Sequence, residues 1–371
     1  MTDIEFFPAA IVGHFNKITS KPECPEYRFW GDRALFKYDK ILYSFYYLQD
    51  RYNKLKLGES YFDSIGYTGK RMIDSGGFQV RTLGVDIKPQ DVIALYKRER
   101  ADVGMILDIP TSIDYDETKV EQTIVNTRYM VEHKNDIPNT EMLNVLHGFT
   151  KAIRRNYYEK VKEFNDKLDG WAVALIKRLA PIHNAWSFVF LYEMDKTLPN
   201  KRFHFLGLTG NKNLPIIYYI GKLGLVKSIS FDSTKYGREG IMADMRNPAF
   251  LMERLSIGKM AKGKLKSNKF CPCPICQNIS MERMIEDSNF VTLHNLFWEI
   301  KKMEFFDSFE TAEDLKNYVL GSKEFPESTK IALKFIDYAL KNGLDKAEDK
   351  FRAEFMWKNI PTKIQTLSEL F

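Results

Sequence analysis

The feature that most restricts the fold is an alternation, from Arg71 onward, between short apolar runs and polar segments long enough to form helices. Segments 89–100 and 116–134 have the length and the spacing of apolar residues expected of helices. Repeated strand–helix units predict parallel strands, and six or more units in one chain favour a closed (β/α)8 barrel of the TIM type over an open sheet. The apolar runs are 71–73, 103–107, 143–146, 171–175, 203–208 and 228–231.

The barrel is expected to occupy residues 1–258. Its first 70 residues are aromatic-rich and irregular, with strand-like stretches only at 34–38 and 40–45. Nothing in this first part indicates chemistry, so we expect the functional residues to lie further along the chain.

Two further parts are predicted after the barrel. Residues 259–306 are expected to hold a zinc-binding subdomain and the barrel helix that follows it. Residues 307–371 mix acidic and basic residues and contain no nucleophile or metal motif, so a packing and docking role is expected. The helices predicted in this extension are 312–320, 330–341 and 345–357.

Composition is that of a globular protein with a large core. The chain has 371 residues, of which 44% are hydrophobic and 28% charged, and no apolar run reaches the length of a membrane span. No basic stretch precedes the apolar residues 6–10, so no signal peptide is expected and the predicted location is the cytoplasm. Four cysteines are too few for a disulfide framework, and the net charge of +6 permits a polyanionic partner.

Polar residues stand where four of the predicted strands end, at Asp74, Asp108, His147 and Asp232. In such barrels the reacting groups lie at these strand ends, so the four side chains are candidates for one site. Asp74 opens the sequence Asp-Ser-Gly-Gly-Phe, in which two glycines permit a sharp turn and Phe78 offers a flat surface for a planar ligand. The alternative is a turn that only caps a strand.

A cysteine cluster predicts a metal site. Cys271, Cys273 and Cys276 form CxCx₂C, and His294 follows after 17 intervening residues. Three thiolates and one imidazole make a closed tetrahedral zinc site of the structural kind. His294 begins a predicted amphipathic helix, so its alternative role is that of a buried core residue, and Cys24 is interpreted as an isolated thiol.

Two basic segments are candidates for binding a phosphate backbone. Residues 233–240 form a predicted glycine-punctuated loop that carries Lys235 and Arg238. The second segment has five lysines immediately before the cysteine cluster. In each case the alternative is an ordinary solvated surface. The lysines are Lys259, Lys262, Lys264, Lys266 and Lys269.

Three motifs in order resemble the tRNA-guanine transglycosylase superfamily. They are Asp-Ser-Gly-Gly-Phe-Gln-Val at 74–80, Phe-Asp with Thr-Lys-Tyr-Gly-Arg-Glu-Gly at 231–240, and CxCx₂C with Leu-His-Asn-Leu at 293–296. The resemblance covers about residues 70–300 and implies a (β/α)8 barrel with a zinc subdomain inserted near its end. It also implies the exchange of a guanine in a polynucleotide for a free 7-deazaguanine base.

The resemblance implies a role for each matching residue. Asp232 would be the nucleophile that attacks C1′ of the target nucleotide. Asp74 would be the general acid and base that protonates the departing base and deprotonates the incoming one. Asp108 would bind the purine's N1–H and exocyclic amine, and Phe78 would stack on the base. Lys235 and Arg238 would grip the nucleic-acid backbone, and the cysteines and His294 would hold structural Zn²⁺.

Two departures from the family pattern bear on the substrate. His147-Gly148 stands where the tRNA enzymes have Gln-Gly at the base edge, and residues 174–177 lack the glycines of their Gly-Gly-Leu-Ala loop. With the unusual N-terminal segment, a Lys/Asn/Ile-rich composition and no expected C-terminal RNA-binding module, these changes favour the superfamily branch that modifies DNA. The first alternative is queuosine- or archaeosine-type exchange on tRNA.

Two competing hypotheses concern catalysis itself. One is a non-catalytic zinc-bearing partner subunit, as in a eukaryotic branch of the superfamily, and the presence of both Asp74 and Asp232 argues against it. The second is a hydrolase that cuts the N-glycosidic bond with the same two acids and admits water. The family's tRNA enzymes often form dimers, so a homodimer is one expected assembly.

Overall fold

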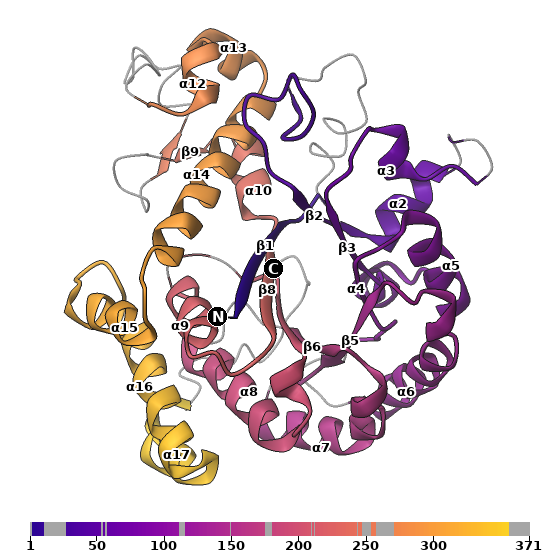
Figure 1. Ribbon diagram of the computed structural model, residues 1–371, viewed down its shortest axis with the longest axis vertical. Coiled ribbons are helices and arrows are strands. Elements are labelled where there is room, and N and C mark those ends of the chain that lie inside the picture. The colour runs from indigo at the N-terminus through magenta and orange to yellow at the C-terminus, as the bar shows by residue number, and fades with distance from the viewer. Residues whose placement is uncertain are drawn as a thin grey trace.

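The computed structural model describes residues 2–10, 27–52, 55, 58–110, 116–148, 150–174, 180–208, 210, 212–242, 244–246, 254–256 and 271–355. Its centre is an eight-stranded parallel sheet in the order β1-β8-β7-β6-β5-β4-β3-β2 (Figure 1). The strands are β1 (Asp3–Pro8), β2 (Lys40–Ser44), β3 (Lys70–Asp74), β4 (Val103–Met105), β5 (Glu141–Leu146), β6 (Gly170–Ala174), β7 (Arg202–Leu206) and β8 (Ser228–Ser233).

The two edge strands of this sheet meet and bring it close to a closed barrel. Ala9, just after β1, forms a parallel bridge with Leu42 of β2, and the Ala10 N–H donates to the Leu42 carbonyl at 2.8 Å. Helices follow the strands around the outside of the ring (Figure 1). The predicted (β/α)8 barrel of the TIM type is therefore confirmed.

The α-helices described before the cysteine cluster each come after one of the barrel strands β2 to β8 along the chain. They are α2 (Phe45–Tyr52), α3 (Tyr61–Ser64), α4 (Gly77–Leu83), α5 (Pro89–Glu99), α6 (Glu117–Glu132), α7 (Lys151–Val161), α8 (Pro181–Met194), α9 (Leu214–Lys222) and α10 (Lys235–Ile241). A short antiparallel pair, β9 (Asp244–Arg246) and β10 (Arg254–Ser256), follows α10.

The predicted helices at 89–100 and 116–134 are confirmed by α5 and α6, and their ends follow from local chemistry. Pro89 stands at the first turn of α5, where its missing N–H removes no helical hydrogen bond. The Asp116 side chain caps α6 by accepting from the Lys119 N–H at 3.3 Å.

The interpretation of the first 70 residues as mostly irregular is wrong, since they contain helices α2 and α3 and a strand that was not predicted. Residues 34–38 do not form a strand, whereas Asp3–Pro8 does and pairs in parallel with β8. The strand escaped detection because Glu5 interrupts its apolar run, and an isolated carboxylate is not expected inside a barrel. The strand-like stretch at 40–45 is confirmed by β2.

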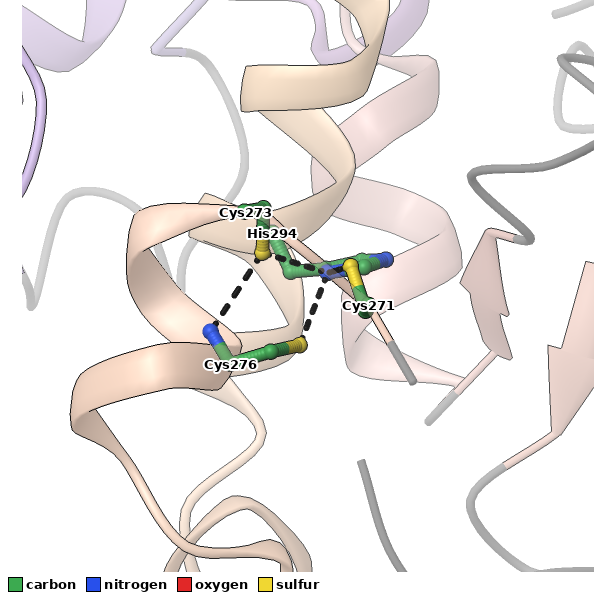
Figure 2. Close-up of side chains that lie close together, drawn as sticks. All are labelled: Cys271, Cys273, Cys276 and His294. Carbon is green, nitrogen blue, oxygen red and sulfur yellow. Dashed lines mark hydrogen bonds between the residues drawn. The ribbon is translucent and has the colours of Figure 1, made fainter. Parts of the chain in front are cut away.

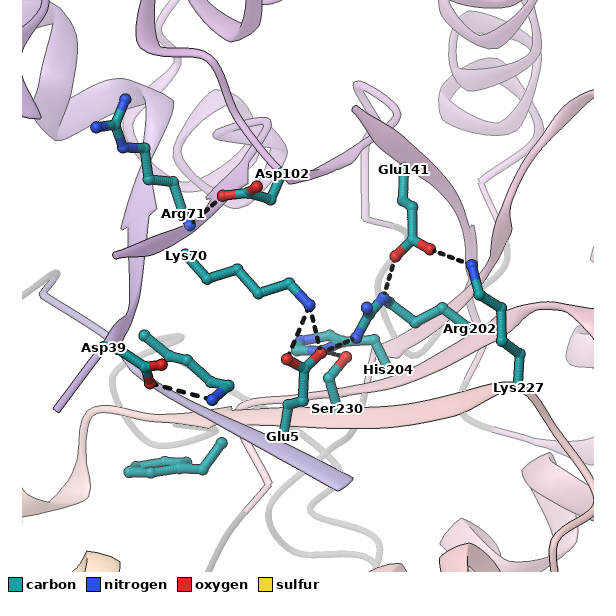
Figure 3. A network of polar contacts seen from close by, with 12 residues as sticks. Glu5, Asp39, Lys70, Arg71, Asp102, Glu141, Arg202, His204, Lys227 and Ser230 are labelled. Atoms are coloured by element: carbon teal, nitrogen blue, oxygen red, sulfur yellow. Dashed lines mark hydrogen bonds and ion pairs between the residues drawn. The ribbon is translucent and has the colours of Figure 1, made fainter. Parts of the chain in front are cut away.

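Partners from distant strands explain how Glu5 is buried. Its carboxylate lies 2.8 Å from Lys70 Nζ and 2.6 Å from Arg202 Nη1, and Arg202 Nε lies 2.6 Å from Glu141 Oε2 (Figure 3). Burial alone would raise the pKa of Glu5, but Arg202 and Lys70 lower it below its ordinary value. These four residues begin or lie early in their strands, so we call them the amino-end ion layer of the barrel.

The C-terminal helices lie against one side of the barrel (Figure 1). Glu348 of α17 accepts a hydrogen bond from the Trp186 indole of α8 at 2.6 Å and pairs with Lys151 and Arg155 of α7 at 2.9 Å. These helices are α15 (Ala312–Gly321), α16 (Glu327–Asn342) and α17 (Leu344–Lys350). The predictions at 312–320 and 330–341 are confirmed, whereas the helix predicted at 345–357 ends at Lys350 and a 3-10 turn follows at Arg352–Phe355. In the described part of the chain, no helix combines the length and apolar character needed to cross a bilayer.

We predict that Glu5→Gln lowers the free energy of unfolding by about 3 kcal/mol, because it removes one partner of a buried ion pair. Urea unfolding monitored by circular dichroism measures the change. The pKa of Glu5 is lowered in the folded state, so its stabilisation is present above the ordinary glutamate pKa and is lost as the pH falls through the lowered value. The difference between wild type and variant should therefore shrink in acid.

Lys37→Ala is the matched control, since the Lys37–Asp32 pair has side chains 67% and 101% exposed and should contribute nothing measurable. An unchanged unfolding midpoint in Glu5→Gln would remove the ion layer from any role in stability.

Candidate active site and metal centre

Strand register places the candidate residues at one end of the barrel. Asp232 of β8 is in register with Phe7 of β1, and Asp74 of β3 is in register with Ser44 of β2. Because all eight strands run parallel, their carboxyl ends share one rim. Asp108 and His147 follow β4 and β5 at the same rim. The sequence prediction that these strand-end side chains converge is consistent with this arrangement.

Asp74 is held in a bent loop that two glycines make possible. Its Oδ1 accepts hydrogen bonds from Ser44 Oγ at 2.9 Å and from the Gly76 N–H at 2.8 Å. Gly76 has a φ of 79°, and a Cβ on Gly77 would lie 1.7 Å from the Asp108 carbonyl oxygen. The loop after β3 can therefore approach the end of β4 only because position 77 has no side chain.

Burial raises the pKa of Asp74 to about 7, against the opposing effect of its two hydrogen bonds. The negative charges of Asp232 and Asp108 contribute to the same increase. A carboxyl group with such a pKa exists in both protonation states near neutral pH, as a group that gives and takes a proton requires.

Asp108 and His147 form a contact pair. His147 Nε2 lies 2.7 Å from Asp108 Oδ2, although the ring N–H is not aligned for a hydrogen bond. Ser75 Oγ donates to Asp108 Oδ1 at 3.3 Å, and the edge of Tyr157 packs against the imidazole of His147. Helix α6 fixes the backbone on both sides of Asp108. Asn126 Nδ2 donates to the Leu107 carbonyl, and the Ile109 N–H donates to Thr123 Oγ1.

The hydrogen-bond contacts that Asp232 makes with described residues lie on one of its oxygen atoms. Its Oδ1 accepts from the Gly207 N–H at 2.6 Å and lies 3.3 Å from His204 Nε2. His204 Nδ1 lies 2.8 Å from Ser230 Oγ, and both His204 and Ser230 are fully buried. Asp232 itself is 5% exposed.

The other candidate side chains lie in helices that begin at the same rim, and Gly148 lies in the loop after β5. Phe78 is in the first turn of α4 and is partly buried. Lys235 and Arg238 belong to helix α10, so the prediction of a glycine-punctuated loop at 233–240 is wrong beyond residue 234. Lys235 Nζ lies 3.8 Å from Glu239 Oε1. Gly148 follows β5 with a φ of 121°, a conformation that favours glycine, and its carbonyl accepts from Arg154 Nε at 2.7 Å.

Several predictions concern residues outside the described part of the chain. They include the lysines between 259 and 269, residues 175–177 of the second departure from the family pattern, Cys24 and the final residues 356–371.

The three cysteines and His294 converge, as predicted from their spacing. Their ligand atoms lie within 4.8 Å of one another and all four residues are buried (Figure 2). Cys273 and Cys276 flank the start of α12 (Pro274–Asn278), and after α13 (Met281–Glu286) the chain enters α14 (Asn289–Asp307), which carries His294. In this arrangement the four residues could together hold one metal ion.

The spacing of the donor atoms tests this fit. His294 Nδ1 lies 3.7, 3.2 and 3.3 Å from the sulfur atoms of Cys271, Cys273 and Cys276. Metal bonds of ordinary zinc length set tetrahedrally around one ion separate sulfur from nitrogen by about 3.5 Å. The Cys276 N–H and the Trp298 indole approach Cys273 and Cys271 sulfur at 3.3 Å each, which favours the thiolate form.

Sequence reasoning missed the residues that hold the two acids. Ser44, Gly207, His204 and Ser230 were not singled out, because a single polar residue inside an apolar run carries little signal. The signal for His204 was its position two residues after Arg202: alternation along a strand places both on one face. Two polar residues on that face of a barrel strand need partners inside the barrel.

Comparison with known proteins supports the predicted superfamily. No family model matches the chain. The tRNA-guanine(15) transglycosylase of Methanocaldococcus jannaschii is 26% identical over 296 residues, 74% of this chain and 42% of the relative. The enzymes of the same name from Methanococcus vannielii and Korarchaeum cryptofilum are 23% and 22% identical, covering 64% and 65% of this chain and 37% and 40% of the relatives.

The chain is therefore a parallel barrel with acidic side chains at its carboxyl rim, the rim where barrel enzymes place their active sites, and with a Cys3His cluster that could hold a metal ion. The resemblance to the tRNA-guanine transglycosylase superfamily that the motifs predicted is thus confirmed by several relatives of that name. The chain spans about two fifths of the length of these three relatives.

We predict that Cys273→Ser loses the bound metal and lowers the melting temperature by roughly 10 °C, because a closed metal site contributes directly to folding free energy. Elemental analysis by mass spectrometry and a thermal melt measure the two effects. Cys24→Ser is the control for a cysteine outside the cluster and should retain the metal. A wild-type protein purified without chelator that contains no stoichiometric metal would contradict this account.

Proposed function

We propose that this protein is a guanine transglycosylase that exchanges a guanine of a polynucleotide for a free 7-deazaguanine base. The observation that carries the proposal is that Asp74 and Asp232 come from two separate strands and stand at one rim of the barrel. The negative charge of Asp232 contributes to the raised pKa of Asp74. A double displacement at a glycosidic carbon requires one carboxylate as nucleophile and a second carboxyl group that gives and takes a proton.

In the first displacement, Asp232 attacks C1′ of the target nucleotide while Asp74, protonated, gives its proton to the departing guanine. The C1′–N9 bond breaks, its electrons leave with the base, and a glycosyl ester forms on Asp232. In the second, Asp74 as a carboxylate removes the proton from N9 of the incoming base, which attacks C1′ and releases Asp232. Two inversions retain the configuration of the sugar.

The base would lie between Phe78 and the pair formed by Asp108 and His147. The Asp108 carboxylate would accept hydrogen bonds and donate none, which suits the N1–H and amine of a guanine-type ring. His147, 2.7 Å from Asp108, would present its imidazole where the family pattern has a glutamine amide. Lys235 and Arg238, at the same rim, would contact the sugar-phosphate backbone, and the target base would have to leave its stack to enter.

We assign Zn²⁺ to the Cys3His cluster, with Cys271, Cys273, Cys276 and His294 as its four ligands. Four protein ligands leave no open position, so the ion would be structural and would tie the α12 region to α14.

Whether the polynucleotide substrate is tRNA or DNA is a separate question. The relatives are named for tRNA, and this observation favours tRNA as the substrate. The replacement of the family's glutamine by His147 favours the DNA-modifying branch. Exchange of labelled guanine measured on tRNA and on double-stranded DNA in parallel separates the two substrates, and both use the same Asp74 and Asp232.

We predict that Asp232→Asn reduces covalent trapping of the polynucleotide by roughly 10³-fold or more while noncovalent binding survives, because an amide is not a nucleophile toward C1′. Incubation without the incoming base, followed by a denaturing gel, measures the trapped adduct. Asp39→Asn, near the amino-terminal end of β2, is the matched control and should trap normally. Undiminished trapping by Asp232→Asn would exclude this residue as the nucleophile.

We predict that the rate of adduct formation falls tenfold per pH unit above about pH 7, because Asp74 must be protonated to expel guanine and its pKa is raised to about 7. Single-turnover measurements from pH 5 to 9 give the profile. Asp74→Asn should form adduct slowly and without this descending limb. A profile in Asp74→Asn that still falls above pH 7 would assign the titration to another group.

A further inference from the structure

The interior of the barrel contains a column of polar side chains beneath Asp232. Ser228, Ser230 and Asp232 alternate with apolar residues along β8 and therefore share one face of the strand. His204 of β7 is in register with Ser230 and stands two residues above Arg202 of the amino-end ion layer. Figure 3 shows His204 beside Ser230 and Glu5.

The hydrogen bonds of His204 determine its tautomer. Nε2 faces a carboxylate oxygen at 3.3 Å, which can only accept, so Nε2 carries the proton. Burial lowers the pKa of His204 and Arg202 lowers it too, while Asp232 and Glu5 act in the opposite direction, and the balance favours the neutral ring. Nδ1 is then an acceptor, and Ser230 Oγ–H donates to it at 2.8 Å.

The donors on Asp232 are unequal between its two oxygen atoms. Both the Gly207 N–H and His204 Nε2–H reach Oδ1. Among the residues that the structure describes, none donates a hydrogen bond to Oδ2. An oxygen held by two N–H donors is the weaker nucleophile, so the second oxygen is the one free to form a bond.

We propose that His204, held by Ser230, is a positioning residue that fixes Oδ1 of Asp232 and thereby leaves Oδ2 as the attacking atom. The inference deepens the proposed function and rests on Asp232 as nucleophile. When Oδ2 bonds to C1′ and the C1′–N9 electrons leave with guanine, Oδ1 becomes the ester carbonyl oxygen. When the incoming base displaces Asp232, the electrons of the Oδ2–C1′ bond return to a carboxylate whose charge the two N–H donors stabilise.

A neutral imidazole suits this position better than a charged one. An imidazolium would bind the ionised carboxylate tightly and lower its reactivity, whereas a neutral N–H orients it without neutralising its charge. Asp232 excludes the opposite tautomer, because a neutral ring with its proton on Nδ1 would present an acceptor lone pair to the carboxylate. Ser230 holds the ring from its other side, by donating to Nδ1 while Nε2–H faces Asp232.

Two substitutions of His204 test the proposal by kinetics. His204→Phe removes the donor and is expected to slow single-turnover adduct formation by about 10²-fold with the polynucleotide dissociation constant unchanged, as for loss of one preorganised donor. His204→Gln keeps an N–H at the Nε2 position and should stay within about tenfold of wild type. Thermal melts of both variants establish that the barrel is folded.

The contrast between the two variants separates positioning from packing. Equal losses in His204→Gln and His204→Phe, or wild-type rates in His204→Phe, would overturn the proposal. A second readout needs no substrate: two-bond ¹H–¹⁵N correlation spectra of the free protein, with the His204 signals assigned by their loss in His204→Gln, should show the neutral Nε2–H tautomer. An Nδ1–H tautomer or an imidazolium at pH 7 would also overturn it.

This spectrum distinguishes failure of the inference from failure of the proposed function. If the wild-type protein forms no adduct with tRNA or with DNA, the proposed function fails, while the tautomer of His204 still decides the hydrogen-bond assignment. If adduct forms and the His204 variants do not differ, the base exchange stands and the positioning role falls.

Discussion

The buried pair between Glu5 and Arg202 is the interaction on which the arrangement of the barrel depends. Glu5 comes from the first strand and Arg202 from the seventh, and Lys70 and Glu141 extend the layer to the third and fifth strands. Each charge is tolerated in the interior only because the others surround it. The layer therefore binds strands that lie far apart in the sequence at the amino-terminal end of the barrel.

From this layer the polar column continues through His204 and Ser230 to Asp232 at the opposite rim. Barrel enzymes of this type place chemistry at the carboxyl ends of the strands and stability at the amino ends, and this protein connects the two by side chains on one face of β7 and β8. A carboxylate supported in this way keeps its orientation through contacts that include side chains on neighbouring strands.

The sequence predicted the barrel and the four strand-end residues because parallel strands with helical connections leave a periodic pattern. It also predicted the cysteine cluster, since CxCx₂C with a later histidine supplies a complete set of four tetrahedral ligands. It did not predict β1, whose Glu5 made the run look unlike a buried strand, or helix α10, whose two glycines suggested a loop. In both cases a tertiary contact overrides the local pattern.

The order of amino acids alone was enough to predict the fold class, the resemblance to the superfamily and the identity of the acids at the rim. How those acids differ depends on the folded barrel: burial and the charges of Asp108 and Asp232 raise the pKa of Asp74, while Gly207 and His204 hold one oxygen of Asp232. These differences arise from groups on separate strands, brought together by the closure of the barrel. Local sequence cannot encode them, because the distances that set them exist only after the strands have paired.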